Sequence, residues 1–197
     1  MIRIRPRHTN NRSLPFQPPT NPGYLLEVGK VMPDSSAKKV WISPQVYESI
    51  HAWVQESLTL DPIPEVGGML GGMRQESEGG WEIFLTHFLP ARSVNFQSPV
   101  RIDFGSQIML DWDRVCQENP GLQLAGWFHT HPGLTPYLSW TDLYTHQGFF
   151  GHPSQVAMVL DPLTSAWDLA CFTWQRKGRM NNKPDLIRYF SWNSIPS

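Results

Sequence analysis

The stretch that decides the fold is GWFHTHPGLTPYLSWTDLYTH, residues 126–146. The mostly apolar run Gln123–Phe128, which begins three residues before this stretch and overlaps its start, predicts a short buried strand. Ser139 has the character of a helix N-cap, which predicts a helix over Trp140–Phe150. A loop between the strand and the helix is predicted by three turn residues, Pro132, Gly133 and Pro136.

Three side chains in this stretch have the types and the spacing of metal ligands. His129 and His131 are two residues apart at the end of the predicted strand, so both point to one face while Thr130 points to the other. Asp142 falls in the first helical turn, where the helix dipole favours an ionised carboxylate. Two imidazoles and one carboxylate suit a zinc ion whose fourth position is left for water. The spacing alone leaves open a structural histidine pair and a simple cap formed by Ser139 and Asp142.

The whole string resembles a known family. The run from His129 to Pro132, together with Ser139 and Asp142, fits the H-x-H-x7-S-x2-D signature of the JAMM zinc isopeptidases, also called MPN-type or JAB-domain proteins. The flanking residues look most like the endosome-associated, AMSH-like members. The resemblance covers about residues 40–174. It implies an α/β (α+β) fold: one domain with a central mixed β-sheet flanked by helices, similar to cytidine deaminases.

A second unusual segment lies upstream and reads EVGGMLGG, residues 65–72. Pro62 and Pro64 hold the backbone before it extended. Four glycines within a strand pattern indicate that other groups approach the backbone closely. The segment resembles the E-[TV]-x-G-x-L-x-G segment of JAMM proteins, which supplies their catalytic glutamate, and this assigns Glu65. On the residues alone, Glu65 as an ordinary loop carboxylate remains open.

The resemblance also implies a reaction. Glu65 and Ser139 are the expected catalytic residues: Glu65 as general base, Ser139 as a hydrogen-bond donor to the tetrahedral oxyanion. The expected substrate is the (iso)peptide bond after the C-terminus of ubiquitin or a ubiquitin-like protein, in deconjugation or precursor processing. The expected partners are that protein, its conjugates, and the activating and conjugating enzymes of the same system.

Two alternatives remain, a non-catalytic scaffold of the same fold and a zinc amidohydrolase acting on another substrate. The H-x-E and P-C-x-x-C motifs of nucleobase deaminases are absent from the sequence.

The number of zinc ions is expected to be one. Endosome-associated members carry a second, structural zinc, one of whose ligands is a histidine two residues after the metal-binding aspartate. Tyr144 stands at that position here, and no cysteine follows His146 and His152 closely enough to complete a set of four ligands. The small, free-standing design looks more like the bacterial JAMM proteins that act within ubiquitin-like conjugation systems.

Composition bounds the remaining possibilities. A chain of 197 residues suits one domain, and a net charge of −1 argues against nucleic acid or an anionic membrane as a partner. Cys116 and Cys171 lie in apolar segments, so we expect free thiols in a reducing cytoplasm, with one disulfide as the alternative. The sequence contains no run of eighteen apolar residues and no signal-peptide pattern, so we expect a soluble, cytoplasmic protein.

Two regions are expected along the chain. Residues 1–23 are basic and rich in Pro and Asn, which predicts an arm that is either a flexible tail or a docking segment for an acidic partner. Residues 24–197 are expected to form the metallopeptidase domain. Within it, Ser43 and Pro44 begin one helix, Gln107–Gln117 forms another, and Pro90–Asp103 is irregular. Strands are expected over Tyr24–Val31, Lys38–Ser43, Trp81–Leu89, Gln155–Leu160 (ended by Asp161-Pro162), Ala166–Trp174 and Leu186–Trp192.

Overall fold

The computed structural model describes residues 23–175, 178–180 and 189–194. The strands are β1 Tyr24–Leu26, β2 Ala37–Ile42, β3 Gly67–Ser77, β4 Gly80–Pro90, β5 Val94–Ser98, β6 Arg101–Phe104, β7 Gln123–Thr130, β8 Val156–Asp161, β9 Asp168–Thr173 and β10 Tyr189–Ser191. The helices are α1 Val28–Val31, α2 Pro44–Ser57, α3 Gln107–Glu118 and α4 Trp140–Phe149, with a 3-10 turn η2 at Trp192–Ser194.

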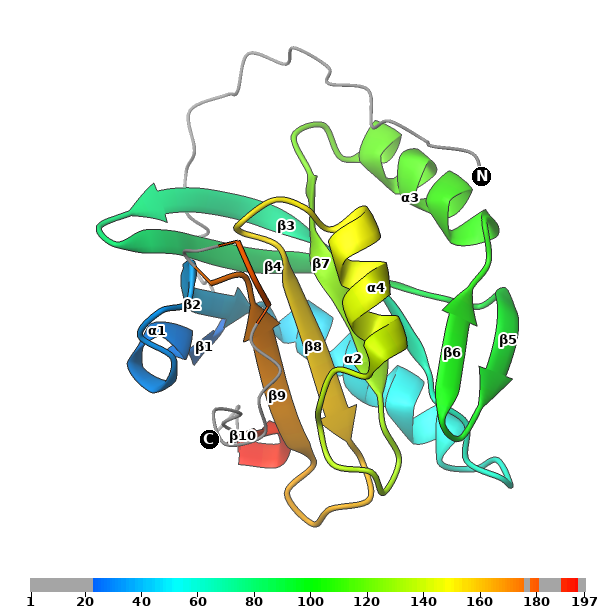
Figure 1. Ribbon diagram of the computed structural model, residues 1–197. Helices are drawn as coiled ribbons and strands as arrows, with labels where there is room; N and C mark the ends of the chain where they lie inside the picture. The colour runs from blue at the N-terminus through cyan, green and yellow to red at the C-terminus, as the bar shows by residue number, and fades with distance from the viewer. Residues whose placement is uncertain (1–22, 176–177, 181–188, 195–197) are drawn as a thin grey trace.

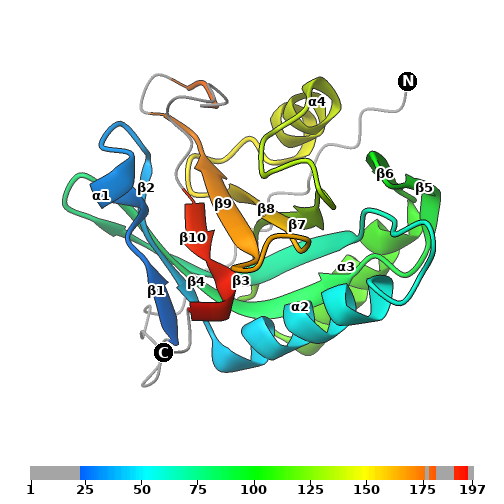
Figure 2. The same cartoon turned by 90° about the horizontal axis from the view of Figure 1, so that it is seen from below.

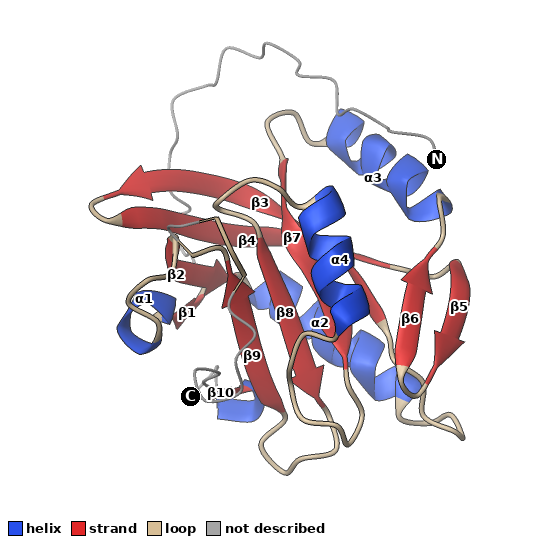
Figure 3. Cartoon of the chain, in the orientation of Figure 1, coloured by secondary structure: helices blue, strands red, loops and turns tan. Residues whose placement is uncertain are grey.

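An eight-stranded mixed sheet forms the centre of the molecule (Figure 1). Its strand order is β1-β2-β4-β3-β7-β8-β9-β10. The pairs β2–β4 and β7–β8 are parallel, and the other pairs in this sheet are antiparallel. Helices lie on both sides of the sheet, as Figure 3 shows by secondary structure. The expected fold class, a central mixed sheet flanked by helices, is therefore confirmed.

Helix α2 covers one face of the sheet, and α3 and α4 cover the other. Buried side chains of α2 recur every four residues and pack in one cluster with Leu70 of β3 and Phe128 of β7. Neighbours of opposite orientation on these strands, Met69 and Trp127, belong to the clusters under α3 and α4. Figure 2 shows α2 and α4 on opposite sides of the sheet. The α2 residues concerned are Val46, Ile50 and Val54.

Strand β7 lies between β3 and β8, contains His129 and ends directly before His131. Six of its residues, from Ala125 to Thr130, are buried. Opposite His129 on β3 stands Gly67, where an added Cβ would lie 2.4 Å from the carbonyl oxygen of Phe128 and 3.0 Å from Cβ of His129. The glycine expected to allow close approach therefore does so directly beside His129.

Two sequence expectations are wrong. Residues 90–103, expected to be irregular, contain the two-stranded sheet of β5 and β6. The β-like run over residues 24–31 is a short strand, β1, followed by the short helix α1. In both cases the presence or absence of a strand partner, rather than local propensity, decides the state of a short segment: β5 and β6 pair with each other, whereas β1 pairs with β2 only over Tyr24–Leu26.

Most of the residues expected to form the two ends of the chain lie outside the described residues. Of the arm over residues 1–23, all but Gly23 lie outside the described residues. Of the last expected strand, Tyr189–Ser191 is β10, while residues 186–188 lie outside the described part. Cys116 and Cys171 are free thiols, as expected. In the described part of the chain, no helix is both long enough and apolar enough to cross a membrane.

Candidate active site

Two histidines at the end of β7 direct ring nitrogens to one point. His129 lies within β7, and His131 follows directly after the strand ends at Thr130. The two Nε2 atoms are 3.0 Å apart, with the rings tilted at 72°. Because two N–H groups cannot face each other at this distance, at least one Nε2 presents a lone pair here.

Asp142 brings a carboxylate to the same point from the first turn of α4. Its Oδ2 lies 3.5 Å from Nε2 of His129 and 3.6 Å from Nε2 of His131. The same oxygen accepts a hydrogen bond of 2.7 Å from the backbone N–H of Ser139, and Oγ of Ser139 accepts one of 3.2 Å from the N–H of Asp142. This reciprocal capping box begins the helix and also fixes the carboxylate.

The ionisation states of these side chains suit a cation. Burial alone would raise the pKa of Asp142, but the electrostatic interaction with His129 and hydrogen bonds from both histidines and Ser139 outweigh it and hold this pKa well below its ordinary value. For His129, complete burial is the largest influence and lowers the pKa, so the ring is neutral at pH 7. Neutral imidazole and ionised carboxylate are the forms that bind zinc.

Glu65 reaches this group from a distant part of the chain. It precedes β3, is 3% exposed, and places Oε1 3.6 Å from Nε2 of His131. Burial is the largest influence on its carboxyl and raises the pKa to about 7; Asp142 adds to this, while His131 and the backbone N–H of Ile102 oppose it. A carboxyl group with such a pKa can accept and release protons near neutral pH.

The β5–β6 hairpin holds Glu65 by three hydrogen bonds. The backbone N–H of Glu65 donates to the carbonyl of Ser98 at 2.8 Å. The side-chain amide of Gln97 donates to the carbonyl of Glu65 at 2.8 Å. The N–H of Ile102 donates to the carboxylate itself. Sequence reasoning missed these residues because it predicted no pairing for this segment.

Thr130 joins the segment of Glu65 to β7. It points away from the histidines, and its Oγ1 accepts a hydrogen bond of 2.9 Å from the N–H of Val66. Its own backbone N–H donates to the carbonyl of Val66 at 2.8 Å. Glu65 and the two histidines are therefore connected through the two hydrogen bonds between Val66 and Thr130, one to the threonine hydroxyl and one from its backbone N–H.

The loop between His131 and α4 is held by Asp161, at the end of β8. This carboxylate is 2% exposed and accepts hydrogen bonds from the N–H groups of Gly133 at 2.9 Å and Thr135 at 3.0 Å. It also accepts one from Leu163 at 3.0 Å. The sequence predicts Asp161 only as the end of a strand, since nothing local indicates that it faces this loop.

Ser139 lies directly against the group. It is half-buried, and the capping interpretation of its side chain is confirmed. As an acceptor from Asp142, its hydroxyl still has its own hydrogen to donate. A donor role towards a reacting carbonyl stays a prediction.

The donor set fits one zinc ion. The ligand atoms of His129, His131 and Asp142 all lie within 4.8 Å of one another, and all three residues are buried. Two nitrogens and one oxygen converging in this way match the protein ligands of a catalytic zinc centre, which leaves one coordination position open.

Aromatic rings surround the histidine pair. Trp127 stacks on His129, with centroids 4.4 Å apart and planes at 7°, and its Nε1–H donates to Nδ1 of His146 at 3.0 Å. Burial lowers the pKa of His146 to about 3. His152 instead bonds through Nδ1 to Ser154 at 2.8 Å. Neither of these two histidines is part of the three-residue group.

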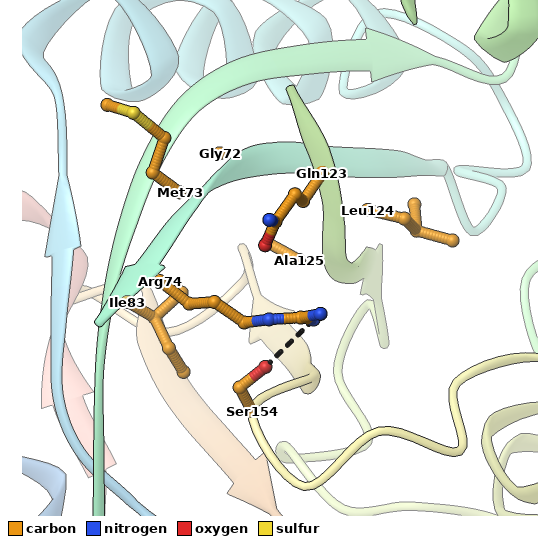
Figure 4. Close-up of a pocket in the computed structure, with 8 residues that line it drawn as sticks. All are labelled: Gly72, Met73, Arg74, Ile83, Gln123, Leu124, Ala125 and Ser154. Carbon is orange, nitrogen blue, oxygen red and sulfur yellow. Dashed lines mark hydrogen bonds between the residues drawn. The ribbon is translucent and has the colours of Figure 1, made fainter. Parts of the chain in front are cut away.

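A recess lies at the opposite end of β7 from the histidine pair. It is shallow and is lined in part by Gln123, the first residue of that strand. Figure 4 shows the guanidinium of Arg74 crossing it to Oγ of Ser154, 3.1 Å away. None of the predicted site residues lines this recess.

Comparison with known proteins matches the part of the chain that contains Glu65 and the His129, His131 and Asp142 group. The family model of the JAB1/Mov34/MPN/PAD-1 ubiquitin protease matches residues 35–151. An AMSH-like protease of Mus musculus is 38% identical over 72 residues, which make up 32% of this chain and 16% of that protein. COP9 signalosome complex subunit 5 of Neurospora crassa is 26% identical over 162 residues, 73% of this chain and 47% of that protein.

The fold has a counterpart among solved structures. A protein from Desulfitobacterium hafniense, known from its solution structure, superimposes with a TM-score of 0.53 at 19% identity, covering 73% of this chain and 89% of that one. By contrast, the chain spans less than half the length of both curated relatives. With more than half of its residues matched by the family model, the chain belongs to the JAB1/Mov34/MPN/PAD-1 ubiquitin protease family.

Proposed function

We propose that this protein is a zinc-dependent isopeptidase or protease that hydrolyses the (iso)peptide bond after the C-terminus of ubiquitin or a ubiquitin-like protein. The observation that carries the proposal is the meeting of Glu65 with His129, His131 and Asp142 in one buried group. Family membership supports the choice of substrate class. The activating and conjugating enzymes of the same system are the proposed further partners.

The proposed roles follow from the positions of the side chains. His129, His131 and Asp142 would hold the zinc ion. When bound, the ion would polarise the scissile carbonyl and lower the pKa of a bound water towards neutrality. Glu65, buried and with a pKa raised to about 7, accepts a proton from the attacking water and passes it to the leaving amine. Ser139, at the N-terminus of α4, donates its hydroxyl hydrogen to the oxyanion.

The proposed substrate tail binds as an added strand beside the β5–β6 hairpin. This hairpin forms a separate two-stranded sheet, and its Ser98 and Ile102 already contact Glu65. Two apolar side chains on it are exposed, Phe96 at 50% and Val100 at 68%. Exposed strand edges beside a reacting centre bind extended peptides through backbone hydrogen bonds.

The test uses ubiquitin carrying a fluorogenic C-terminal amide and isopeptide-linked diubiquitin as probes. We expect Glu65→Gln to retain zinc but to lose about 100- to 10,000-fold in kcat, the usual range for a general base. The matched control is Glu76→Gln, the same change at an exposed position of β3. Undiminished turnover by Glu65→Gln would remove this residue as the base.

The same assay addresses the alternatives. A scaffold protein would cleave neither probe while remaining able to bind ubiquitin, and a zinc amidohydrolase of other specificity would cleave small amides but neither probe. Zinc-dependent cleavage of either ubiquitin probe by the wild type, lost in Glu65→Gln, is the result that supports the proposal.

A further inference from the structure

We infer that the β5–β6 hairpin is the element that positions Glu65, and that Gln97 is the positioning residue within it. The inference rests on the proposed function for its catalytic consequence. Its structural part concerns only how Glu65 is held, which can be measured whether or not the protein cleaves a ubiquitin-like substrate.

Glu65 is held at three different atoms by two consecutive cross-strand residue pairs, or rungs, of one hairpin. Gln97 and Ile102 are cross-strand partners, and the next rung pairs Ser98 with Arg101. The first rung bonds to the backbone carbonyl of Glu65 through Gln97 and to its carboxylate through Ile102. The second rung accepts the backbone N–H of Glu65 at Ser98. The register of the hairpin therefore fixes both the backbone and the side chain of Glu65.

Gln97 is the one member of this arrangement that acts through its side chain. The contributions of Ser98 and Ile102 come from the backbone, which any residue supplies. Gln97 is exposed, so a substitution there removes a hydrogen bond without opening a cavity in a core. The residue can therefore be changed while the fold is left intact.

The hairpin reaches the body of the protein elsewhere through apolar contacts. Val94 and Phe104, at its two ends, pack on the cluster under α3, and Phe104 meets Trp127 edge to face at 5.9 Å. These contacts keep the hairpin attached at its base. The rung of Gln97 and Ile102 sets where the carboxylate of Glu65 lies relative to His131, 3.6 Å away.

The first measurement is amide hydrogen exchange by NMR on zinc-loaded protein. We expect Gln97→Met, which keeps the length of the side chain and removes its donor, to speed exchange of the Glu65 and Ile102 amides by about 3- to 10-fold, as the loss of one hydrogen bond predicts. The amide of Val159 in β8 should be unchanged. The matched control is Gln75→Met on β3, where the same change is made at an exposed residue.

The second measurement is the division between kcat and KM with the fluorogenic ubiquitin amide. We expect Gln97→Met to lower kcat by a similar factor, with KM within about twofold and zinc content unchanged, because a catalytic group that is less well placed slows the chemical step. A residue with a merely structural role would lower the unfolding midpoint without this division.

The outcomes separate the two proposals. Unchanged exchange at Glu65 and Ile102 in Gln97→Met overturns the positioning role, whatever the activity. Faster exchange with unchanged kcat also overturns it, because Glu65 would then work equally well when loosened. Should the wild type fail to cleave either ubiquitin probe, the proposed function fails, and the exchange rates alone decide whether Gln97 positions Glu65.

Discussion

Asp161 shows how a single buried carboxylate can shape a site without belonging to it. It accepts hydrogen bonds from three backbone N–H groups, two of them in the loop that follows His131. We expect Asp161→Asn to lower the free energy of unfolding by about 2–3 kcal/mol, because hydrogen bonds to a charged acceptor are lost and the new amide faces N–H donors. Urea unfolding measures the change. The matched control is Asp168→Asn on β9, half-buried, and an equal loss in both variants would contradict the prediction.

His146 should make stability depend on pH in a defined direction. Burial lowers its pKa to about 3 in the folded protein, whereas an unfolded histidine titrates near 6.5. Below about pH 6.5 the unfolded chain gains a proton that the folded protein does not, so stability present above this pH is lost as pH falls towards 3. The slope is about 1.4 kcal/mol per pH unit for one such group.

The measurement compares the wild type with His146→Gln by urea unfolding between pH 7 and pH 5. The glutamine does not titrate, and its carbonyl can still accept the hydrogen bond from Trp127. We expect the difference in unfolding free energy between the two proteins to shift towards the variant as pH falls. Parallel pH dependences would show that His146 does not carry this effect.

Helix α4 begins at the residue proposed to assist catalysis, so two roles of Ser139 have to be separated. As an N-cap, it should contribute about 1 kcal/mol to stability. As an oxyanion donor, it should contribute about 100- to 1000-fold to kcat. We expect Ser139→Ala to lose both.

Ser139→Asp provides the separation, because aspartate caps helices well but cannot donate a hydrogen bond when ionised. We expect this variant to regain most of the stability of the wild type and none of its activity. Zinc content is measured in parallel, since the backbone N–H of residue 139 also bonds Asp142. Recovery of activity in Ser139→Asp would leave the residue as a cap alone.

The elements that could be predicted from the sequence are those whose determinants lie within the element itself. The strand, loop and helix around residues 123–150 depend on local signals: an apolar run, turn residues and a capping serine. The β5–β6 hairpin pairs two short, partly exposed strands. Apolar and polar residues alternate from Val94 to Gln97 and from Val100 to Phe104, but each run is short and Pro99 separates them. The hairpin's contacts with Glu65 involve backbone groups of Ser98 and Ile102, and backbone groups leave no trace in residue identity.

At the scale of the whole molecule, the group that could hold zinc joins parts of the chain that are distant in sequence. His129 belongs to the central strand, Asp142 to a helix on its surface, and Glu65 to the segment entering β3. The sequence linked Glu65 to the other residues only through resemblance to a family, since no spacing links residue 65 to residue 129. The order of the sheet, with β3 beside β7, supplies the physical reason.

This arrangement predicts that zinc stabilises the entire fold. A ligand that binds only the folded state adds about 2.7 kcal/mol at a concentration one hundred times its Kd. We expect about one zinc per chain by metal analysis, as one open catalytic site implies, and a fall in the melting temperature when a chelator removes it. The double variant His129→Ala, His131→Ala should contain no zinc, and the chelator should leave its melting temperature unchanged.

Glu65→Gln provides the matched control for this effect, because the change leaves the three proposed ligands intact. We expect it to bind zinc and to respond to the chelator as the wild type does. Stoichiometric zinc in the double histidine variant would place the metal elsewhere in the chain. A wild-type melting temperature that the chelator leaves unchanged would mean that the ion does not link β7 to α4, because a cation held by both elements must favour the state in which they meet.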